Sequence, residues 1–390
     1  MYYYIDHTSR FHHNTGIQRC VRAIAKALIE IGIPLRPLVW DRLNNTLAPA
    51  SSSAIHHLQN WNGPLASDWE ILFSNDHWSD KWLLIVELIS GPYCPLPQQL
   101  RLATEKAQLK VAWIFHDAIP WRLPSLYGDR AASASTNHSV YMNGLYLFER
   151  VFANSHTTAQ HLYEFLADSG HNTARISELV KPLPLATEFP GVARPEALRY
   201  AEIIDYITNM KKRPFRLLCV GSLEPRKNHK CLMKAILFLK STGSFNAELK
   251  LVGWANNKTI VDLVCRAIDI SHDVQWEVEA SDQRLAELYN WCDATVYPSI
   301  EEGFGLPVAE SMWYRKPCIC SGAGALGELA SLGGCLTTNT SDWQELAHTI
   351  DELAKNSSLY NSLISSLNER LMRTWNSYAV ELASNLREIV

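Results

Sequence analysis

Short apolar runs alternate with helical stretches through the second half of this 390-residue chain, and this alternation constrains the fold more than any other feature. The runs that predict strands are Arg216–Val220, Leu249–Val252, Val274–Val278, Ala294–Tyr297 and Cys318–Cys320. The stretches with helical spacing are 231–240, 258–270, 282–290 and 307–315. Such alternation is typical of a parallel sheet covered by helices on both faces, so the predicted fold class is α/β.

The first half contains the same kinds of element in a less regular order. Apolar residues at helical spacing predict an amphipathic helix over 17–31. Lys110–Phe115 and Val151–Ala153 predict short buried strands, and Ser155 predicts the N-cap of the helix that follows.

Regularity fades between Lys181 and Pro214, which suggests a connection between domains. A chain of 390 residues suits two domains, taking about 150 residues per domain as a prior. We therefore predict an N-terminal domain over 1–190 and a C-terminal domain over 191–372. The stretch from 341 onward is expected to be helical throughout, with its last part, 373–390, crossing back onto the first domain.

Composition excludes several classes of protein. Hydrophobic residues make up 47% of the chain, which excludes a disordered or coiled-coil protein, and a net charge of -4 offers no basic field for nucleic acid. The nine cysteines form no C-x-x-C pair, so neither a zinc site nor a disulfide framework is expected. Asp6 and Arg10 interrupt any signal peptide, and no apolar run of about 18 residues occurs. We expect a cytoplasmic chain.

The segment 299–316 is the most informative part of the sequence. It follows strand 294–297 and so lies at the carboxyl edge of the predicted sheet, where open α/β sheets bind ligands. Gly303 and Gly305 let the backbone approach a ligand, and Pro307 suits the first position of a helix. The free N–H groups of that helix favour an anion such as phosphate.

Two glutamates flank this anion site. Glu302 precedes the glycine turn, and Glu310 is expected on the first turn of the helix. Because carboxylates repel phosphate, we expect both to bind hydroxyl groups, those of a sugar for Glu302 and those of a ribose for Glu310. The alternative is that both glutamates only complement the helix dipole.

These features resemble the retaining GT-B glycosyltransferases of family 4. The segments that carry the resemblance are Glu302–Glu310, Val220–His229, Leu251–Gly253, Thr15–Arg19 and His116-Asp117. The resemblance covers both halves, most specifically 216–330. It implies a GT-B fold, in which two Rossmann-like, doubly wound domains face a cleft. The first domain would bind the acceptor and the second the nucleotide sugar.

Arg226 and Lys227 follow a strand and a glycine turn, again at a ligand edge. The diphosphate of a sugar nucleotide gains negative charge as the glycosidic bond breaks. A cation at about 4 Å contributes roughly 4 kcal/mol at an effective dielectric of 20, against about 0.3–2 kcal/mol for a helix end. We therefore expect these two cations to be the main stabilisers of the leaving group. The alternative is a solvated surface pair.

The resemblance assigns roles to further residues. It implies that His116 contacts the donor sugar near the reacting carbon and joins Glu302, Arg226 and Lys227 as a catalytic residue. The alternative is a core-edge histidine bonded to Asp117, which would either orient it or cap its own loop. The residues expected to bind the donor are Glu310, Gly16, Phe304, Gly305, Leu306 and Gly221.

Two other patterns are set aside. Residues 322–327 satisfy G-x-G-x-x-G, but the helix after them is cut short by Gly333-Gly334, which argues against NAD binding. The resemblance places a comparable loop near the nucleotide and implies that it ends in a helix that Glu328 begins. Ser155 and His156 lack a G-x-S-x-G elbow, so serine-triad chemistry is not expected.

The resemblance implies a metal-independent retaining hexosyltransferase. It would move a sugar from a nucleotide diphosphate sugar to a saccharide or lipid-linked saccharide acceptor in bacterial surface polysaccharide or glycolipid synthesis. No D-x-D motif occurs, which agrees with the expectation of no metal and no cofactor. A lipid-linked acceptor would bring the chain to the inner face of the membrane. Two alternatives stay open: a sugar-nucleotide epimerase on the same fold, and a non-catalytic protein that binds a nucleotide sugar.

Overall fold

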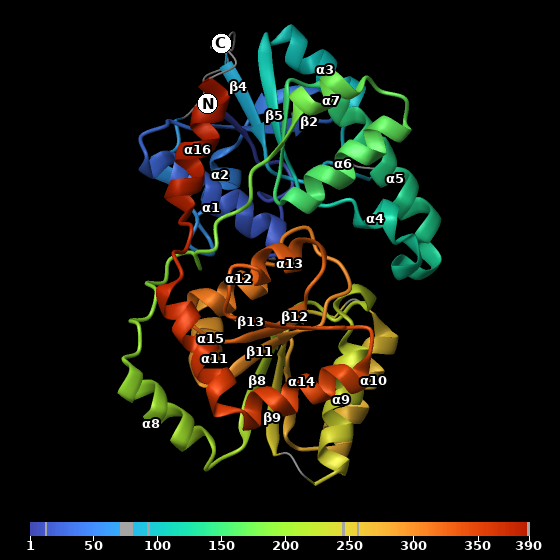
Figure 1. Cartoon of the computed structure of the whole chain (residues 1–390). Coiled ribbons are helices and arrows are strands. Elements are labelled where there is room, and N and C mark those ends of the chain that lie inside the picture. Colours follow the sequence, from blue (N-terminus) through green and yellow to red (C-terminus); the bar gives the residue numbers. More distant parts are fainter. Residues whose placement is uncertain (12–13, 71–80, 92–93, 244–245, 256, 388–390) are drawn as a thin grey trace. The chain divides into compact units, whose positions relative to one another are not determined.

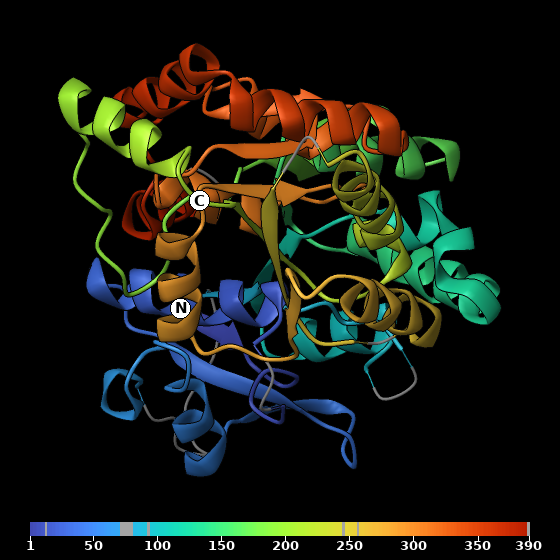
Figure 2. The same ribbon diagram turned by 90° about the horizontal axis from the view of Figure 1, so that it is seen from below.

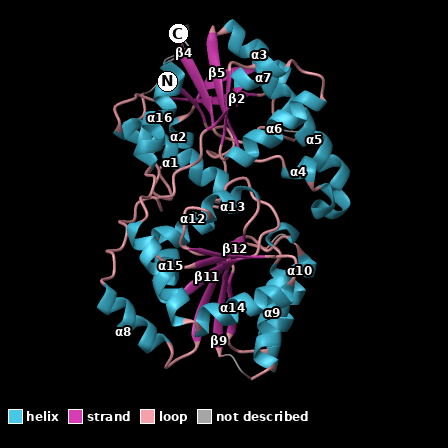
Figure 3. Cartoon of the chain, in the orientation of Figure 1, coloured by secondary structure: helices cyan, strands magenta, loops and turns pink. Residues whose placement is uncertain are grey.

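The chain forms two compact α/β units in a computed structural model (Figure 1). The structure describes all residues except 12–13, 71–80, 92–93, 244–245, 256 and 388–390. The first unit comprises 1–186 together with 373–390, and the second comprises 187–372. Figure 3 shows the strands of each sheet in magenta among cyan helices.

The first unit is built on a seven-stranded sheet of order β3-β2-β1-β4-β5-β6-β7. Its strands are β1 (Tyr2–Tyr4), β2 (Arg36–Asp41), β3 (Thr46–Pro49), β4 (Lys81–Ile85), β5 (Leu109–Phe115), β6 (Arg150–Ala153) and β7 (Val180–Pro182). Neighbouring strands are parallel except for β2 and β3, which pair antiparallel at one edge. At this edge the short turn 42–45 joins the two strands as a hairpin.

Helices cover both faces of this sheet. They are α1 (Gly16–Glu30), α2 (Ser52–Leu58), α3 (Pro97–Lys106), α4 (Ile119–Arg122), α5 (Ala131–Gly144), α6 (His156–Asp168), α7 (Thr173–Leu179) and α16 (Trp375–Arg387). The phenol of Tyr3 donates to the Val21 carbonyl oxygen of α1 (2.7 Å), and α16 packs beside α1. On the opposite face α3, α5 and α6 bury Trp113 and Phe115.

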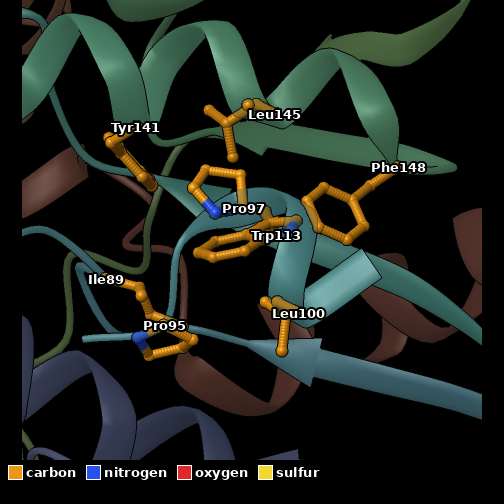
Figure 4. Close-up of a pocket in the computed structure, with 9 residues that line it drawn as sticks. Ile89, Pro95, Pro97, Leu100, Trp113, Tyr141, Leu145 and Phe148 are labelled. Atoms are coloured by element: carbon orange, nitrogen blue, oxygen red, sulfur yellow. The ribbon is translucent and has the colours of Figure 1, made fainter. Parts of the chain in front are cut away.

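Trp113 also lines a cavity of this core, with Pro97, Leu100, Leu145 and Phe148 around it (Figure 4). The cavity holds about 10 Å³, which is room for one water molecule and far too little for a sugar. It is a packing defect rather than a substrate site.

The second unit has a six-stranded sheet of order β10-β9-β8-β11-β12-β13, parallel throughout. Its strands are β8 (Phe215–Val220), β9 (Ala247–Val252), β10 (Val274–Glu277), β11 (Ala294–Tyr297), β12 (Cys318–Ser321) and β13 (Cys335–Thr338). Its helices are α8 (Tyr200–Met210), α9 (His229–Ser241), α10 (Lys258–Ile270), α11 (Asp282–Trp291), α12 (Leu306–Trp313), α13 (Gly324–Ala330), α14 (Trp343–Lys355) and α15 (Ser357–Glu369).

Alternate residues of these strands enter two different cores. Leu217 and Val296 pack with α8, α9, α10, α14 and α15, whereas Leu218 packs with α11 and α12 on the other face. Figures 1 and 2 both show α9 and α10, in yellow, lying next to each other. The sheet is therefore doubly wound, as the sequence predicted.

Most of the predicted elements are confirmed, with small shifts at their ends. The helix expected from residue 307 begins at Leu306, so Pro307 is its second residue. The C-terminal stretch is not helical throughout, because Asn356 separates α14 from α15 and residues 370–374 are not helical. Among the described residues, none of the helices combines the length and the hydropathy that a membrane span requires.

Candidate active site

Two loops meet at the carboxyl edge of the second unit's sheet. The first follows β8 and contains the short 3-10 turn η4 (Pro225–Lys227), and the second connects β11 to α12. The backbone N–H of Ile300 donates to the Arg226 carbonyl oxygen (2.9 Å) and ties the loops together. The strands therefore deliver Arg226, Lys227 and Glu302 to one place, as the sequence predicted from its two ligand edges.

Glu302 is the common partner of both cations. Arg226 Nη1 donates to Glu302 Oε2 (2.5 Å), and Lys227 Nζ donates to Glu302 Oε1 (2.7 Å). Arg226 Nη2 also donates to Glu224 Oε1 (2.8 Å). The four side chains carry two positive and two negative charges, so their formal charges cancel. The alternative of a solvated basic pair does not fit this arrangement.

Two hydroxyl groups complete the surroundings of Glu302. Tyr297 donates its phenol hydrogen to Glu302 Oε1 (2.9 Å), and the Ser299 hydroxyl donates to the same oxygen. Lys227 Nζ bonds the Tyr297 oxygen and lies 4.9 Å from the centre of its ring. Because Tyr297 and Ser299 are fixed by β11 and its first loop residues, the carboxylate is held rigidly.

Burial and neighbouring charges shift the pKa values of these groups. Glu302 is 8% exposed and Lys227 is 9% exposed. Burial alone would raise the pKa of Glu302, but Arg226, Lys227 and Ser299 together lower it to about 2. Burial and Arg226 lower the pKa of Lys227, an effect that Glu302 opposes. Glu302 is therefore ionised at neutral pH and cannot act as a proton donor there.

Glycines allow the loops to come this close. Gly253 has φ +149°, and a β-carbon there would lie 2.2 Å from the Gly221 carbonyl oxygen. Gly221, in turn, packs beside Lys227 and Tyr297. Gly305, with φ +103°, is the N-cap of α12, and the helix begins at Leu306, four residues after Glu302. The predicted anion site at this helix end thus belongs to the same edge as the cations.

Glu310 is positioned differently from the expectation. It is the fifth residue of α12, so it lies on the second turn rather than the first, and it is 4% exposed. Tyr289 donates its phenol hydrogen to Glu310 Oε2 (2.7 Å). Phe304 is buried as well, whereas Leu306 is half-buried at the start of α12. The roles of these three residues toward a donor stay predictions.

His116 and Gly16 belong to the first unit. The ring Nε2 of His116 bonds the Val86 carbonyl oxygen (2.6 Å), and burial lowers the pKa of this histidine. Asp117 Oδ1 accepts the N–H of Ile119 (3.0 Å) at the start of α4, so the loop-cap alternative for Asp117 holds. Gly16 is the exposed first residue of α1. Their predicted roles toward the donor stay predictions.

The glycine loop 322–327 packs more tightly than the sequence predicted. Its helix α13 begins at Gly324, so the prediction that Glu328 begins it is wrong. The Gly327 N–H donates to the Ala323 carbonyl oxygen (3.0 Å), a helical bond that starts the first turn before Glu328, and a β-carbon on Gly327 would lie 2.3 Å from the Gly322 carbonyl oxygen.

Sequence reasoning missed Glu224, Tyr297 and Ser299. Tyr297 ends β11, and Ser299 lies in the loop that carries Glu302, so their closeness to Glu302 in the sequence is the signal that could have found them. Glu224 was recognised only as part of a longer motif, although its position two residues before Arg226 could have indicated a pair.

Residues 202–370 match the family of glycosyl transferases group 1. The chain carries this match within its second unit. It is 25% identical over 340 residues to the serotype-specific mannosyltransferase WbdA of Escherichia coli, a match that covers 81% of this chain and 38% of WbdA. It is 31% identical over 143 residues to O-antigen chain mannosyltransferase B of the same species, covering 36% of this chain and 37% of that protein.

Comparison with a solved glycosyltransferase structure confirms the predicted GT-B architecture. WaaG, described as a glycosyltransferase involved in lipopolysaccharide biosynthesis, superposes with a TM-score of 0.65 at 15% identity and covers 98% of both chains. The matches cover 38% of WbdA and 37% of O-antigen chain mannosyltransferase B, which is well under half the length of either relative.

Proposed function

We propose that the chain is a retaining glycosyltransferase of family 4 that moves a sugar from a nucleotide diphosphate sugar to a hydroxyl acceptor without a bound metal. The observation that carries the proposal is the ion-pair cluster of Arg226, Lys227 and Glu302 at the carboxyl edge of the second sheet. Two fixed cations beside a helix N-terminus suit a pyrophosphate, and a buried, ionised carboxylate suits the hydroxyls of a sugar.

The leaving group is stabilised when Arg226 and Lys227 exchange their carboxylate partners for phosphate oxygens. A bound diphosphate offers oxygens to Arg226 and Lys227, which in its absence donate to Glu302 and Glu224. The roughly 4 kcal/mol per cation expected at about 4 Å is an upper bound, because each cation already faces a carboxylate. Charge that develops as the glycosidic bond breaks shifts the balance toward the phosphate oxygens.

The remaining steps need little from the protein. In a front-face reaction the leaving diphosphate itself accepts the acceptor proton, so no general base is assigned. Glu302 holds the donor sugar, and Glu310 and Gly16 are proposed to approach the ribose and the phosphates. His116 is proposed to contact the sugar near its reacting carbon.

The relatives suggest the sugar and the pathway. WbdA and O-antigen chain mannosyltransferase B are mannosyltransferases by name, so we propose mannose as the transferred sugar and a bacterial surface polysaccharide as the product. The acceptor is then a saccharide or a lipid-linked saccharide. The proposed site of action is the cytoplasm, at the inner face of the membrane where the acceptor is lipid-linked.

A panel of UDP-, GDP-, ADP- and dTDP-sugars tests the proposal. One nucleotide should raise the melting temperature, because a ligand at 100 times its Kd stabilises by about 2.7 kcal/mol. Transfer with that donor should continue in a chelator, and the product should keep the anomeric configuration of the donor. The Lys227→Ala variant should lose about 10²–10³ in kcat.

The same assay separates the alternatives. An epimerase would convert the donor sugar with no acceptor present, and a non-catalytic binding protein would bind the donor without turnover. Inversion at the anomeric carbon, a metal requirement for transfer, or full activity of Lys227→Ala would each contradict the proposed mechanism.

A further inference from the structure

Three cysteine side chains come together on one face of the second unit's sheet. Cys318 and Cys320 are two residues apart on β12 and so point to the same face. The strand register pairs Cys318 with Cys335 on the neighbouring strand β13. The three sulfur atoms all lie within 4.8 Å of one another. The transfer reaction proposed above uses none of them.

The surroundings of these cysteines are enclosed on one side and accessible on the other. Cys318 also pairs with Thr295 of β11, whose hydroxyl donates to Ser311 of α12 (2.7 Å), so the cysteines lie on the face that α12 covers. Cys318 and Cys320 are fully buried. Cys335 is half-buried, and its strand β13 is the edge strand of the sheet (Figure 1). A small ion can therefore enter from the edge.

We propose that Cys318, Cys320 and Cys335 form a three-thiolate site for a thiophilic divalent metal ion, with zinc as the biological candidate. Thiolate ligands select such ions over magnesium or calcium. Tetrahedral zinc–sulfur bonds of about 2.3 Å need sulfur atoms about 3.8 Å apart. Closing the present spacing takes a movement of about 1 Å, which small rotations of the three side chains supply.

The charge on the site distinguishes between ions. Three thiolates and one divalent ion carry a net charge of -1. The buried guanidinium of Arg370 donates to the carbonyl oxygens of Leu329 (3.2 Å) and Gly333 (2.9 Å), and it interacts electrostatically with Cys335. It therefore balances the remaining charge. A monovalent ion such as Cu⁺ would leave a second negative charge buried, which is costly.

The spacing of the three cysteines along the chain does not indicate a metal site. No C-x-x-C pair exists, and the third ligand lies 15 positions beyond Cys320 along the chain. It reaches the other two only because α13 returns the chain to pair β13 with β12. A metal there would fasten the edge strand to the sheet, a structural role independent of sugar transfer.

The test uses the full-length chain, reduced and freed of metal, with Co²⁺ as a spectroscopic probe and Zn²⁺ as its competitor. One equivalent of Co²⁺ should give a thiolate-to-cobalt charge-transfer band that Zn²⁺ abolishes. Saturating zinc should raise the melting temperature of this unit by about 5–10 °C. The Cys335→Ser variant should show neither effect, and Cys265→Ser, which changes an exposed cysteine on α10, should behave as wild type.

The proposal is overturned if wild type gives no charge-transfer band, or if the band persists in Cys335→Ser. A disulfide between Cys318 and Cys335 in the protein as purified would also overturn it. Circular dichroism and the melting temperature without metal show whether Cys335→Ser folds like metal-free wild type. If it does not, Cys335→Ala and Cys320→Ala carry the same comparison.

Discussion

Glu302 shows how a single carboxylate can organise a site. It accepts hydrogen bonds from two cations and two hydroxyl groups while remaining 8% exposed. A buried charge is tolerated only when its partners replace the lost hydration. Removing Glu302 therefore leaves Lys227 buried without its carboxylate, so substitutions at Glu302 will cost stability as well as turnover.

A double-mutant cycle measures this coupling. For Arg226→Met and Glu302→Gln we expect a coupling in the free energy of unfolding of about 1.5–3 kcal/mol, because the pair is joined at 2.5 Å and largely shielded from water. The matched control is Arg199 and Glu202, also an Arg–Glu pair at 2.5 Å but 84% and 41% exposed, which should show much weaker coupling because solvent screens it. Equal coupling in the two pairs, measured by urea unfolding, would contradict the shielding argument.

Lys227 should set the alkaline limit of activity. Burial lowers its pKa from the ordinary 10.5, so its positive charge is lost at a lower pH than that of an exposed lysine. We expect kcat/KM to fall on the alkaline side as Lys227 loses its proton, since this ratio reports the free enzyme. Lys227→Arg keeps its charge and should move that limb to higher pH. Lys230→Arg, at an exposed position, should leave the profile unchanged, and an unmoved limb in Lys227→Arg would assign the titration to another group.

At the scale of elements, the alternation of strands and helices could be predicted well in the second unit. Its strands β8, β11 and β12 are mostly apolar runs buried on both faces, and such runs stand out in a sequence. Other strands were missed because they lack this signal. Tyr2–Tyr4 has only three residues, Arg36–Asp41 contains a proline, and Cys335–Thr338 follows two glycines that read as a turn.

The glycine turns between these elements need residues without a β-carbon, and substitution by alanine tests this requirement. Gly253→Ala should lower the free energy of unfolding by about 2–4 kcal/mol, because its β-carbon would lie 2.2 Å from a backbone oxygen that cannot rotate away. Gly243→Ala is the control: φ is +63° there but nothing lies within 4 Å, so about 1 kcal/mol is expected. Equal losses in denaturant unfolding would show that φ, rather than the close contact, matters at Gly253.

At the scale of the molecule, the chain's stability depends on pH through two buried glutamates of opposite behaviour. Glu302, with a pKa of about 2, stabilises its unit above pH 4.5 and loses that contribution as the pH falls through 2. Glu87 accepts the N–H groups of His7 (2.8 Å) and Thr8 (2.5 Å), yet burial raises its pKa to about 7. Its folded form holds the proton more tightly, so its contribution is present below pH 4.5 and lost as the pH rises through 7.

Glu87→Gln should make the first unit less sensitive to pH. Between pH 5 and 8, wild type should lose on the order of 3 kcal/mol relative to this variant, which cannot ionise. Urea unfolding of the full chain at several pH values measures the difference. Exposed Glu178→Gln, in the same unit, should follow wild type. Parallel curves for wild type and Glu87→Gln would mean that Glu87 is already ionised at pH 5.

The candidate site could be predicted in part, because some of its contacts follow from the order of the strands and others depend on side-chain packing. Arg226, Lys227 and Glu302 sit beside recognisable glycine turns at strand ends, so their meeting follows from the parallel topology alone. The bond between Tyr289 and Glu310 joins different elements through side-chain packing, which no local pattern encodes. Cys335 is similar, because its neighbours depend on the register of β13.

The placement of α16 affects how the protein is made. During synthesis this helix leaves the ribosome only after every residue of the second unit, although its Tyr378 and Leu382 are buried in the first. The first unit therefore stays incomplete, with the surface of α1 uncovered, while about 190 further residues are translated. At about 5–20 residues per second this takes roughly 10–40 seconds. During that interval the apolar surface of α1 is exposed on the nascent chain, and a chaperone would bind there.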